Sequence, residues 1–224
     1  MSISTPPPPQ KKKSGCGCFG CGCLVVIILI VLFFGLVGAG GYFGYQKALT
    51  ATSTVAADVP SFNGSDELYD STRQKIADAQ THVQNHQSVD IRLSADEINT
   101  LIARTPMGQG QNHLFVSMKD TKGRLQGSIA LNSLFQGKVF KDRFFNFDTS
   151  LSLTFNPDTK LVSVTLHNLQ MGDYKTPPNL IPTMQTEFTT ILNMQFQKSP
   201  DIRALLDQAQ NITIQDGQLV IQTK

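Results

Sequence analysis

The sequence predicts an α+β protein in which a curved antiparallel sheet packs on helices, preceded by one transmembrane helix. Three observations predict this class. The first is an uncharged apolar run near the N-terminus, Leu24–Tyr45. The second is a series of stretches after residue 88 in which apolar and polar residues alternate, as in strands with one solvent-exposed face. The third is the position of amphipathic helical stretches before, among and after those strands, which is typical of this class.

The 224-residue chain divides into four parts. Residues 1–23 are a cytoplasmic tail with a run of prolines, a run of lysines and a cysteine cluster, and this composition is typical of disorder. Residues 24–45 are the apolar run, and residues 46–65 are a linker rich in Thr, Ala, Ser and Gly. Residues 66–224 form one extracytoplasmic domain without cysteine, so an apolar core has to stabilise it without disulfides.

The apolar run has the length of a membrane-spanning helix. At about 1.5 Å per residue, Leu24–Tyr45 spans roughly 33 Å, close to the hydrocarbon thickness of about 30 Å. Lys11–Lys13 precede it and no acidic residue occurs before Asp58, so the positive-inside rule places the N-terminus in the cytoplasm. A cleaved signal peptide ending at Val37–Ala39 is the alternative. We expect a retained anchor because the segment before the run is long and the uncharged residues continue past this site.

Four cysteines lie together at the cytoplasmic edge of the run. They could bind a soft metal ion, carry acyl chains, or remain reduced thiols in a reducing compartment. Their Cys-x-Cys spacing is tighter than the usual Cys-x2-Cys zinc spacing, so we expect reduced thiols and treat the metal site as a weak candidate. The residues are Cys16, Cys18, Cys21 and Cys23.

Small residues near the outer end of the run have the spacing of a helix–helix contact motif. Gly40 and Gly44 are four residues apart, which would allow a homodimer through closely approaching helices. A glycine-rich helix end without a partner has the same pattern, and we favour that interpretation because the motif is common.

The domain contains alternating helical and strand patterns. Ser94 and Glu97 form a capping box at the start of one short helix. Asp216-Gly217 is a strong two-residue turn signal within the closing hairpin. Helices are predicted at residues 66–86, 94–103, 182–197 and 201–210, and strands at 89–93, 113–119, 124–131, 145–155, 161–168, 212–214 and 219–221.

Three segments of the domain carry a family resemblance. Leu93–Ile102 matches the pattern L-t-x-x-E-L-N-x-L-I, Leu166–Pro177 matches l-x-x-l-x-x-G-x-x-x-P, and Asn211–Gln222 matches a closing hairpin. In these segments the chain resembles the YpmS-like membrane-anchored bacterial proteins, whose function is largely uncharacterised. This resemblance implies location in the bacterial cytoplasmic (inner) membrane. More remotely, the domain is similar to tubular lipid-binding (TULIP-like) domains, which implies that the helix beginning at Pro182 lines an apolar groove.

Composition and motifs argue against several functions. After residue 45 the basic and acidic residues nearly balance, which excludes the dense positive charge that nucleic-acid binding needs. No nucleophile elbow, phosphate-binding loop or HExxH motif occurs, so we expect no enzyme and no cofactor, with a hydrolase-like activity as the remote alternative. Asp78, His82 and His86 have the i, i+4, i+8 spacing of a helix face, but a solvated polar face has the same pattern and is our interpretation.

The expected function is binding of lipid or another apolar ligand by a domain held at the membrane. The alternative is an envelope scaffold that binds another protein and has no ligand cavity. A cavity larger than a few water molecules distinguishes the two hypotheses. The candidate groove residues are the large apolar side chains of the strands and of the late helix, Phe115, Phe145, Phe147, Phe155, Met184, Phe188, Met194 and Phe196.

Overall fold

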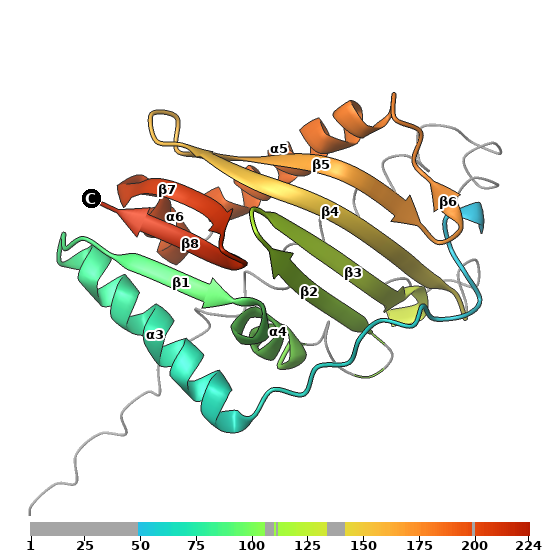
Figure 1. The fold of residues 1–224 in the computed structure, drawn as a ribbon, viewed down its shortest axis with the longest axis horizontal. Coiled ribbons are helices and arrows are strands. Elements are labelled where there is room, and N and C mark those ends of the chain that lie inside the picture. The colour runs from blue at the N-terminus through green and yellow to red at the C-terminus, as the bar shows by residue number, and fades with distance from the viewer. Residues whose placement is uncertain (1–48, 106–109, 111, 134–141, 199) are drawn as a thin grey trace, which may run out of the picture.

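The computed structural model describes residues 49–105, 110, 112–133, 142–198 and 200–224 (Figure 1). The expected anchor at residues 24–45, the cysteine cluster and the pair Gly40 and Gly44 lie outside the described residues. Among the helices that the structure does describe, none has the length and apolar character needed to cross a membrane.

The described residues form an α+β domain with two antiparallel sheets. The larger sheet has the strand order β2-β3-β4-β5-β6, and the smaller has the order β1-β8-β7. The elements in chain order are α3 (Asp66–Gln84), β1 (Asp90–Ser94), α4 (Ala95–Ala103), β2 (His113–Lys119), β3 (Lys122–Ala130), the 3-10 turn η2 (Leu131–Ser133), β4 (Phe144–Asn156), β5 (Leu161–Met171), β6 (Tyr174–Lys175), α5 (Ile181–Lys198), α6 (Pro200–Gln208), β7 (Ala209–Gln215) and β8 (Gln218–Thr223). The α+β class and the antiparallel pairing predicted from the sequence are confirmed.

The register of the larger sheet places the apolar residues of its long strands on one face. Phe147 of β4 lies opposite Gly127 of β3, and a Cβ atom added to Gly127 would collide with the Phe147 ring. Phe145 is 1% exposed and its ring centroid lies 5.5 Å from that of Phe147. With Ile129 and Leu131, both fully buried, these rings fill one end of the inner face. That end of the sheet is therefore closely packed.

Asparagine side chains from helices cover the edge of β2 and the part of β5 that β6 does not reach. Asn99 of α4 donates to the carbonyl oxygen of Val116 at 2.7 Å and accepts from its amide at 2.8 Å. Asn193 of α5 does the same for Val162 of β5, at 2.7 and 2.9 Å. Each side-chain amide therefore replaces the backbone of a missing neighbouring strand, which satisfies buried polar groups and blocks further strand pairing.

Helix α5 is matched in spacing to the strand that it covers. Thr189 accepts from the amide of Val164, and Gln185 accepts from the amide of Leu166. With Asn193, the contacting side chains are spaced four residues apart on α5, which is about 6 Å along a helix axis. Their partners are spaced two residues apart on β5, which is about 6.6 Å along a strand. Because the two repeats nearly coincide, α5 lies along β5 over several turns.

Polar contacts of Lys75 attach helix α3 to α4 and β1. Lys75 forms an ion pair with Glu97 at 2.8 Å and donates to the carbonyl oxygen of Arg92. Burial raises the pKa of Glu97, but its hydrogen bonds with Lys75 and Ser94 outweigh this effect, so that its pKa lies below the ordinary value. The predicted capping box of Ser94 and Glu97 is confirmed.

The residues expected to form a linker lie against the domain instead. Ser53 and Phe144 exchange backbone hydrogen bonds at 2.9 and 2.7 Å. Asn146, on the outer face of β4, donates to the carbonyl oxygen of Val55 and accepts from the amide of Ala57. The prediction of a spacer over residues 46–65 is therefore wrong for the described part of that segment, because polar side chains of the strand bind its backbone.

Candidate apolar ligand cavity

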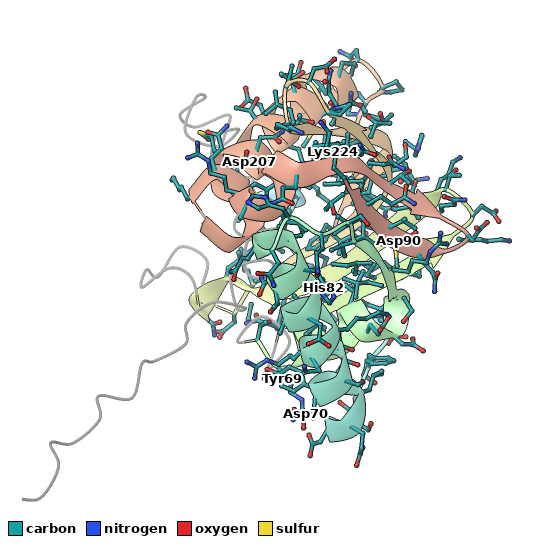
Figure 2. All side chains as sticks on the ribbon, turned by 90° about the vertical axis from the view of Figure 1, so that its left-hand side faces the viewer. Tyr69, Asp70, His82, Asp90, Asp207 and Lys224 are labelled. Carbon is teal, nitrogen blue, oxygen red and sulfur yellow. The ribbon has the colours of Figure 1, made fainter. Side chains whose placement is uncertain are left out.

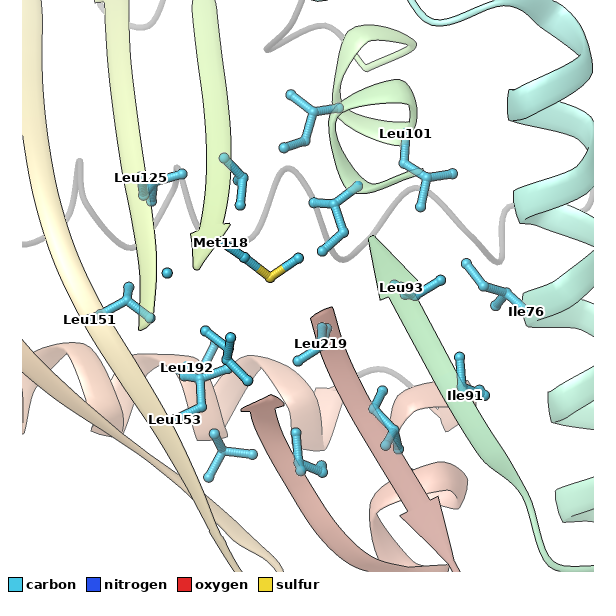
Figure 3. A pocket seen from close by; sticks show the side chains of 18 of the residues that line it. Ile76, Ile91, Leu93, Leu101, Met118, Leu125, Leu151, Leu153, Leu192 and Leu219 are labelled. Carbon is cyan, nitrogen blue, oxygen red and sulfur yellow. The ribbon is translucent and has the colours of Figure 1, made fainter. Parts of the chain in front are cut away.

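A cavity of about 400 Å³ lies between the two sheets. Figure 3 shows side chains from both sheets around it, with Met118, Leu125 and Leu151 from the larger sheet and Leu93 and Leu219 from the smaller. Helices α3, α4, α5 and α6 complete the wall. The site is therefore built from nearly every element of the domain rather than from one loop.

The wall is almost entirely apolar. All of its residues are Ile, Leu, Val, Met or Phe except Tyr69, Arg73, Gln80, Thr105, Gly123 and Arg124. The hydroxyl of buried Thr105 already donates to the carbonyl oxygen of Ile102 at 2.7 Å. A lining of this kind favours a hydrocarbon group over a polar metabolite.

Apart from Gly123 and Arg124, the larger sheet contributes only aliphatic residues and Met118 to the wall. Here β2 and β5 present Val116, Val162 and Val164, whereas the closely packed end of the sheet carries the paired rings of Phe145 and Phe147. An apolar pocket of this size that opens to solvent on one side is a candidate ligand site.

Two close contacts between the sheets fix the distance between them. The amide of Gly217, in the β7–β8 turn, donates to the carbonyl oxygen of Asp120 in the β2–β3 turn at 3.0 Å. Gly123 of β3 faces Ile214 of β7 so closely that an added Cβ would lie 3.0 Å from the Ile214 side chain. The hairpin tips thus join the sheets on one side of the cavity, and both glycines permit the contact.

Helix α3 contributes the polar part of the wall. Tyr69, Arg73, Ile76 and Gln80 follow one helix face that borders the cavity. Two guanidinium groups contact the Tyr69 ring, with that of Arg73 5.6 Å and that of Arg104 5.5 Å from the ring centroid. In Figure 2 this helix lies on the outside of the domain, with Tyr69 near one end and His82 toward the other. The polar side of the cavity therefore borders solvent.

Only part of the predicted groove residues reach the cavity. Phe188 and Phe196, both on α5, belong to the wall, as expected for the helix that begins near Pro182. Met194 of the same helix is 48% exposed and lies on another face. The remaining candidates lie outside the described wall, in the closely packed core or on other parts of the sheet, and these are Phe115, Phe145, Phe147, Phe155 and Met184.

Alternation along the strands accounts for one of these differences. Phe115 lies between Leu114 and Val116, which both line the cavity, so its side chain points to the opposite face of β2. The groove residues predicted from the sequence were Phe and Met, whereas the wall is mainly aliphatic. Six wall residues of the smaller sheet were not among these candidates, although they occupy alternate positions of its short strands, and these are Ile91, Leu93, Ile212, Ile214, Leu219 and Ile221.

The described residues show no metal centre. No group of three or more His, Cys, Asp or Glu side chains comes together among them. On α3, a ring nitrogen of His82 lies 2.6 Å from the backbone oxygen of Asp78, and the Asp78 carboxylate accepts from Gln74. These contacts are internal to the helix and consistent with a solvated polar face.

Neither a family model nor a curated protein matches this chain. The fold and the cavity define it as an α+β domain with an apolar internal site. The YpmS-like and TULIP-like resemblances stay predictions.

Proposed function

We propose that this chain is a membrane-anchored, non-enzymatic protein whose extracytoplasmic domain binds one lipid or other apolar ligand. The observation that carries the proposal is the apolar cavity of about 400 Å³ between the sheets. Ligand sites commonly have volumes of about 300–1,000 Å³ and a mostly apolar lining, and this cavity has both properties.

The chemistry of the wall supports binding rather than catalysis. Acid–base or nucleophilic catalysis needs titratable or nucleophilic groups that converge on the substrate. The described wall residues include no carboxylate, imidazole or thiol. Their contribution to a ligand is exclusion of water and dispersion contact, which stabilise a bound hydrocarbon chain.

In this proposal the run Leu24–Tyr45 anchors the chain in the bacterial cytoplasmic membrane, with the tail in the cytoplasm. Residues 46–48 span at most about 11 Å, so the part of the domain at residues 49–52 would face the bilayer. Figure 1 places this part beside β6, and α3 on the other side of the domain. Residues of α3 line the cavity. A ligand in the cavity would therefore be held away from the bilayer, as in a carrier.

Native mass spectrometry of the full chain, purified in mild detergent, tests the proposal. The expected result is a fraction of the protein with one tightly bound apolar molecule that survives detergent exchange. Leu219→Trp and Met118→Trp should reduce this fraction because both residues line the cavity, while Leu180→Trp, at an exposed position outside the wall, should leave it unchanged. Equal occupancy in all variants would place the molecule elsewhere and contradict the proposal.

A further inference from the structure

We propose that the ligand is a single-chain carboxylate whose hydrocarbon tail occupies the cavity and whose carboxylate pairs with Arg73 on α3. The inference rests on the proposed apolar-ligand function and specifies the ligand class. It is carried by the size of the cavity, the one-sided position of its polar residues and the charge of Arg73.

The volume corresponds to one hydrocarbon chain. A dry apolar cavity of about 150 Å³ in another protein accommodates a six-carbon ring, so about 400 Å³ accommodates on the order of 16 carbon atoms. A lipid with two long chains exceeds this volume about twofold. The cavity therefore favours a ligand with one chain.

The polar residues of the wall that can meet a head group all lie on α3. Arg124 is held on the outer face of the larger sheet by Asp148, to which its Nε donates at 2.9 Å, and this hydrogen bond raises the pKa of Arg124. Thr105 is engaged with the backbone of α4, as described above. Tyr69, Arg73 and Gln80 remain, at i, i+4 and i+11 on one helix face. A ligand with one polar end would therefore direct that end toward α3.

Arg73 has the charge that a carboxylate needs. Within the described part of the chain, it takes part in none of the ion pairs, although Asp70 lies one turn before it on the same helix. Its guanidinium rests against the Tyr69 ring, which orients it without neutralising it. A guanidinium binds a carboxylate through two parallel hydrogen bonds, which suits an unneutralised arginine at the rim of an apolar cavity.

The charges around Arg73 favour a ligand whose head group carries one negative charge over a ligand whose head group carries two. Arg104, the other guanidinium against Tyr69, is paired with Asp66. Lys75, two residues after Arg73, is paired with Glu97. A phosphate monoester carries nearly two negative charges at neutral pH and would need a second cation that is not already paired. A carboxylate needs only Arg73.

Photoaffinity labelling of the full chain in nanodiscs tests this assignment. The probes are a saturated carboxylic acid of about 16 carbons with a mid-chain diazirine, and the alcohol of the same length. Crosslinks are mapped by mass spectrometry to the cavity residues of β1, β2 and β8, and the probe concentration at half-maximal labelling is compared. The proteins are the wild type, Arg73→Gln, Arg73→Lys, and the control Arg203→Gln on the exposed face of α6.

In the wild type, half-maximal labelling by the acid should require a concentration about three- to tenfold lower than by the alcohol. Arg73→Gln should remove this preference, so that acid and alcohol label at similar concentrations, Arg73→Lys should keep most of it, and Arg203→Gln should keep all of it. Equal labelling by acid and alcohol in the wild type, or a preference that persists in Arg73→Gln, would overturn the carboxylate assignment and leave the proposed function intact. Absence of cavity crosslinks with both probes would instead contradict the proposed function itself.

Discussion

Replacement of Val164 by Phe measures the space between the sheets directly. Val164 is 1% exposed, lies on β5 and lines the cavity. Phe adds four carbon atoms, which at about 0.8 kcal/mol per buried methylene gives an upper limit of about 3 kcal/mol. Because the ring has to be ordered and will not fill the space completely, we expect the free energy of unfolding to rise by about 1–2 kcal/mol.

The matched control is the same substitution at Val220. This residue is fully buried in β8 but is not part of the described cavity wall. A larger side chain there has no free volume to enter, so Val220→Phe should lower the free energy of unfolding by about 1–3 kcal/mol. The two substitutions add the same atoms to buried strand valines. Changes of opposite sign in the free energy of unfolding would therefore be due to the cavity.

Urea unfolding of the delipidated full chain in nonionic micelles, followed by far-ultraviolet circular dichroism, provides both values. A loss of stability of similar size in both variants would refute the reasoning, because it would mean that the space beside Val164 is not available to a side chain.

Three other substitutions test the contacts that position the sheets, with the free energy of unfolding measured in each case. Asn99→Ala should lower it by about 2–4 kcal/mol, since the buried amide and carbonyl of Val116 lose their partners; an effect below about 0.5 kcal/mol would show that the edge is not covered as described. Gly127→Ala should lower it by about 1–3 kcal/mol through collision with Phe147, and the penalty should shrink in a Phe147→Leu background; an unchanged penalty would exclude that collision. The folded-state pKa of Glu97 lies below its ordinary value, so its contribution is present above the unfolded pKa of about 4.3 and is lost as the pH falls through the folded pKa. Acidification from about pH 5 to pH 3 should therefore remove up to about 1 kcal/mol in the wild type and less in Glu97→Gln, and parallel pH profiles would contradict this role.

Local signals in the sequence predicted several elements well. The alternation of β4, the capping box at Ser94 and the turn at Asp216-Gly217 depend on residues close together in the chain. Asp216 and Gly217 both adopt positive φ angles, 52° and 70°, as a two-residue hairpin turn requires. Such features can be predicted from residue periodicity and turn-forming residues alone.

The division into two sheets could not be predicted in the same way. Strand β1 pairs with β8, so that Ile91 lies opposite Ile221, and no local pattern specifies which distant strand is the partner. The cavity depends on this pairing, because the aliphatic residues of the smaller sheet form its second wall. Alternation identified these residues as buried, but burial in a filled core and burial around a cavity give the same pattern.

The buried asparagines were the most informative residues that the sequence analysis did not single out. Asn99 lies within the pattern that suggested the YpmS-like resemblance, and its side chain covers the edge of β2. Asn193 covers the edge of β5. A polar residue on the apolar face of a predicted helix was the available signal, since a buried amide needs partners and an exposed strand edge supplies both a donor and an acceptor.

Methionine methyl NMR tests whether an acyl chain enters the space between the sheets. The full chain, labelled with ¹³C at its methionine methyl groups and placed in nanodiscs, is titrated with a saturated carboxylate of about 16 carbons. Met118 lines the cavity, Met184 and Met171 are buried outside its described wall, and Met194 is exposed. We predict intermolecular nuclear Overhauser effects from the acyl chain to the Met118 methyl group and none to those of Met171, Met184 and Met194. Contacts to Met194 or Met184 without contacts to Met118 would show that the chain binds elsewhere and would contradict the account.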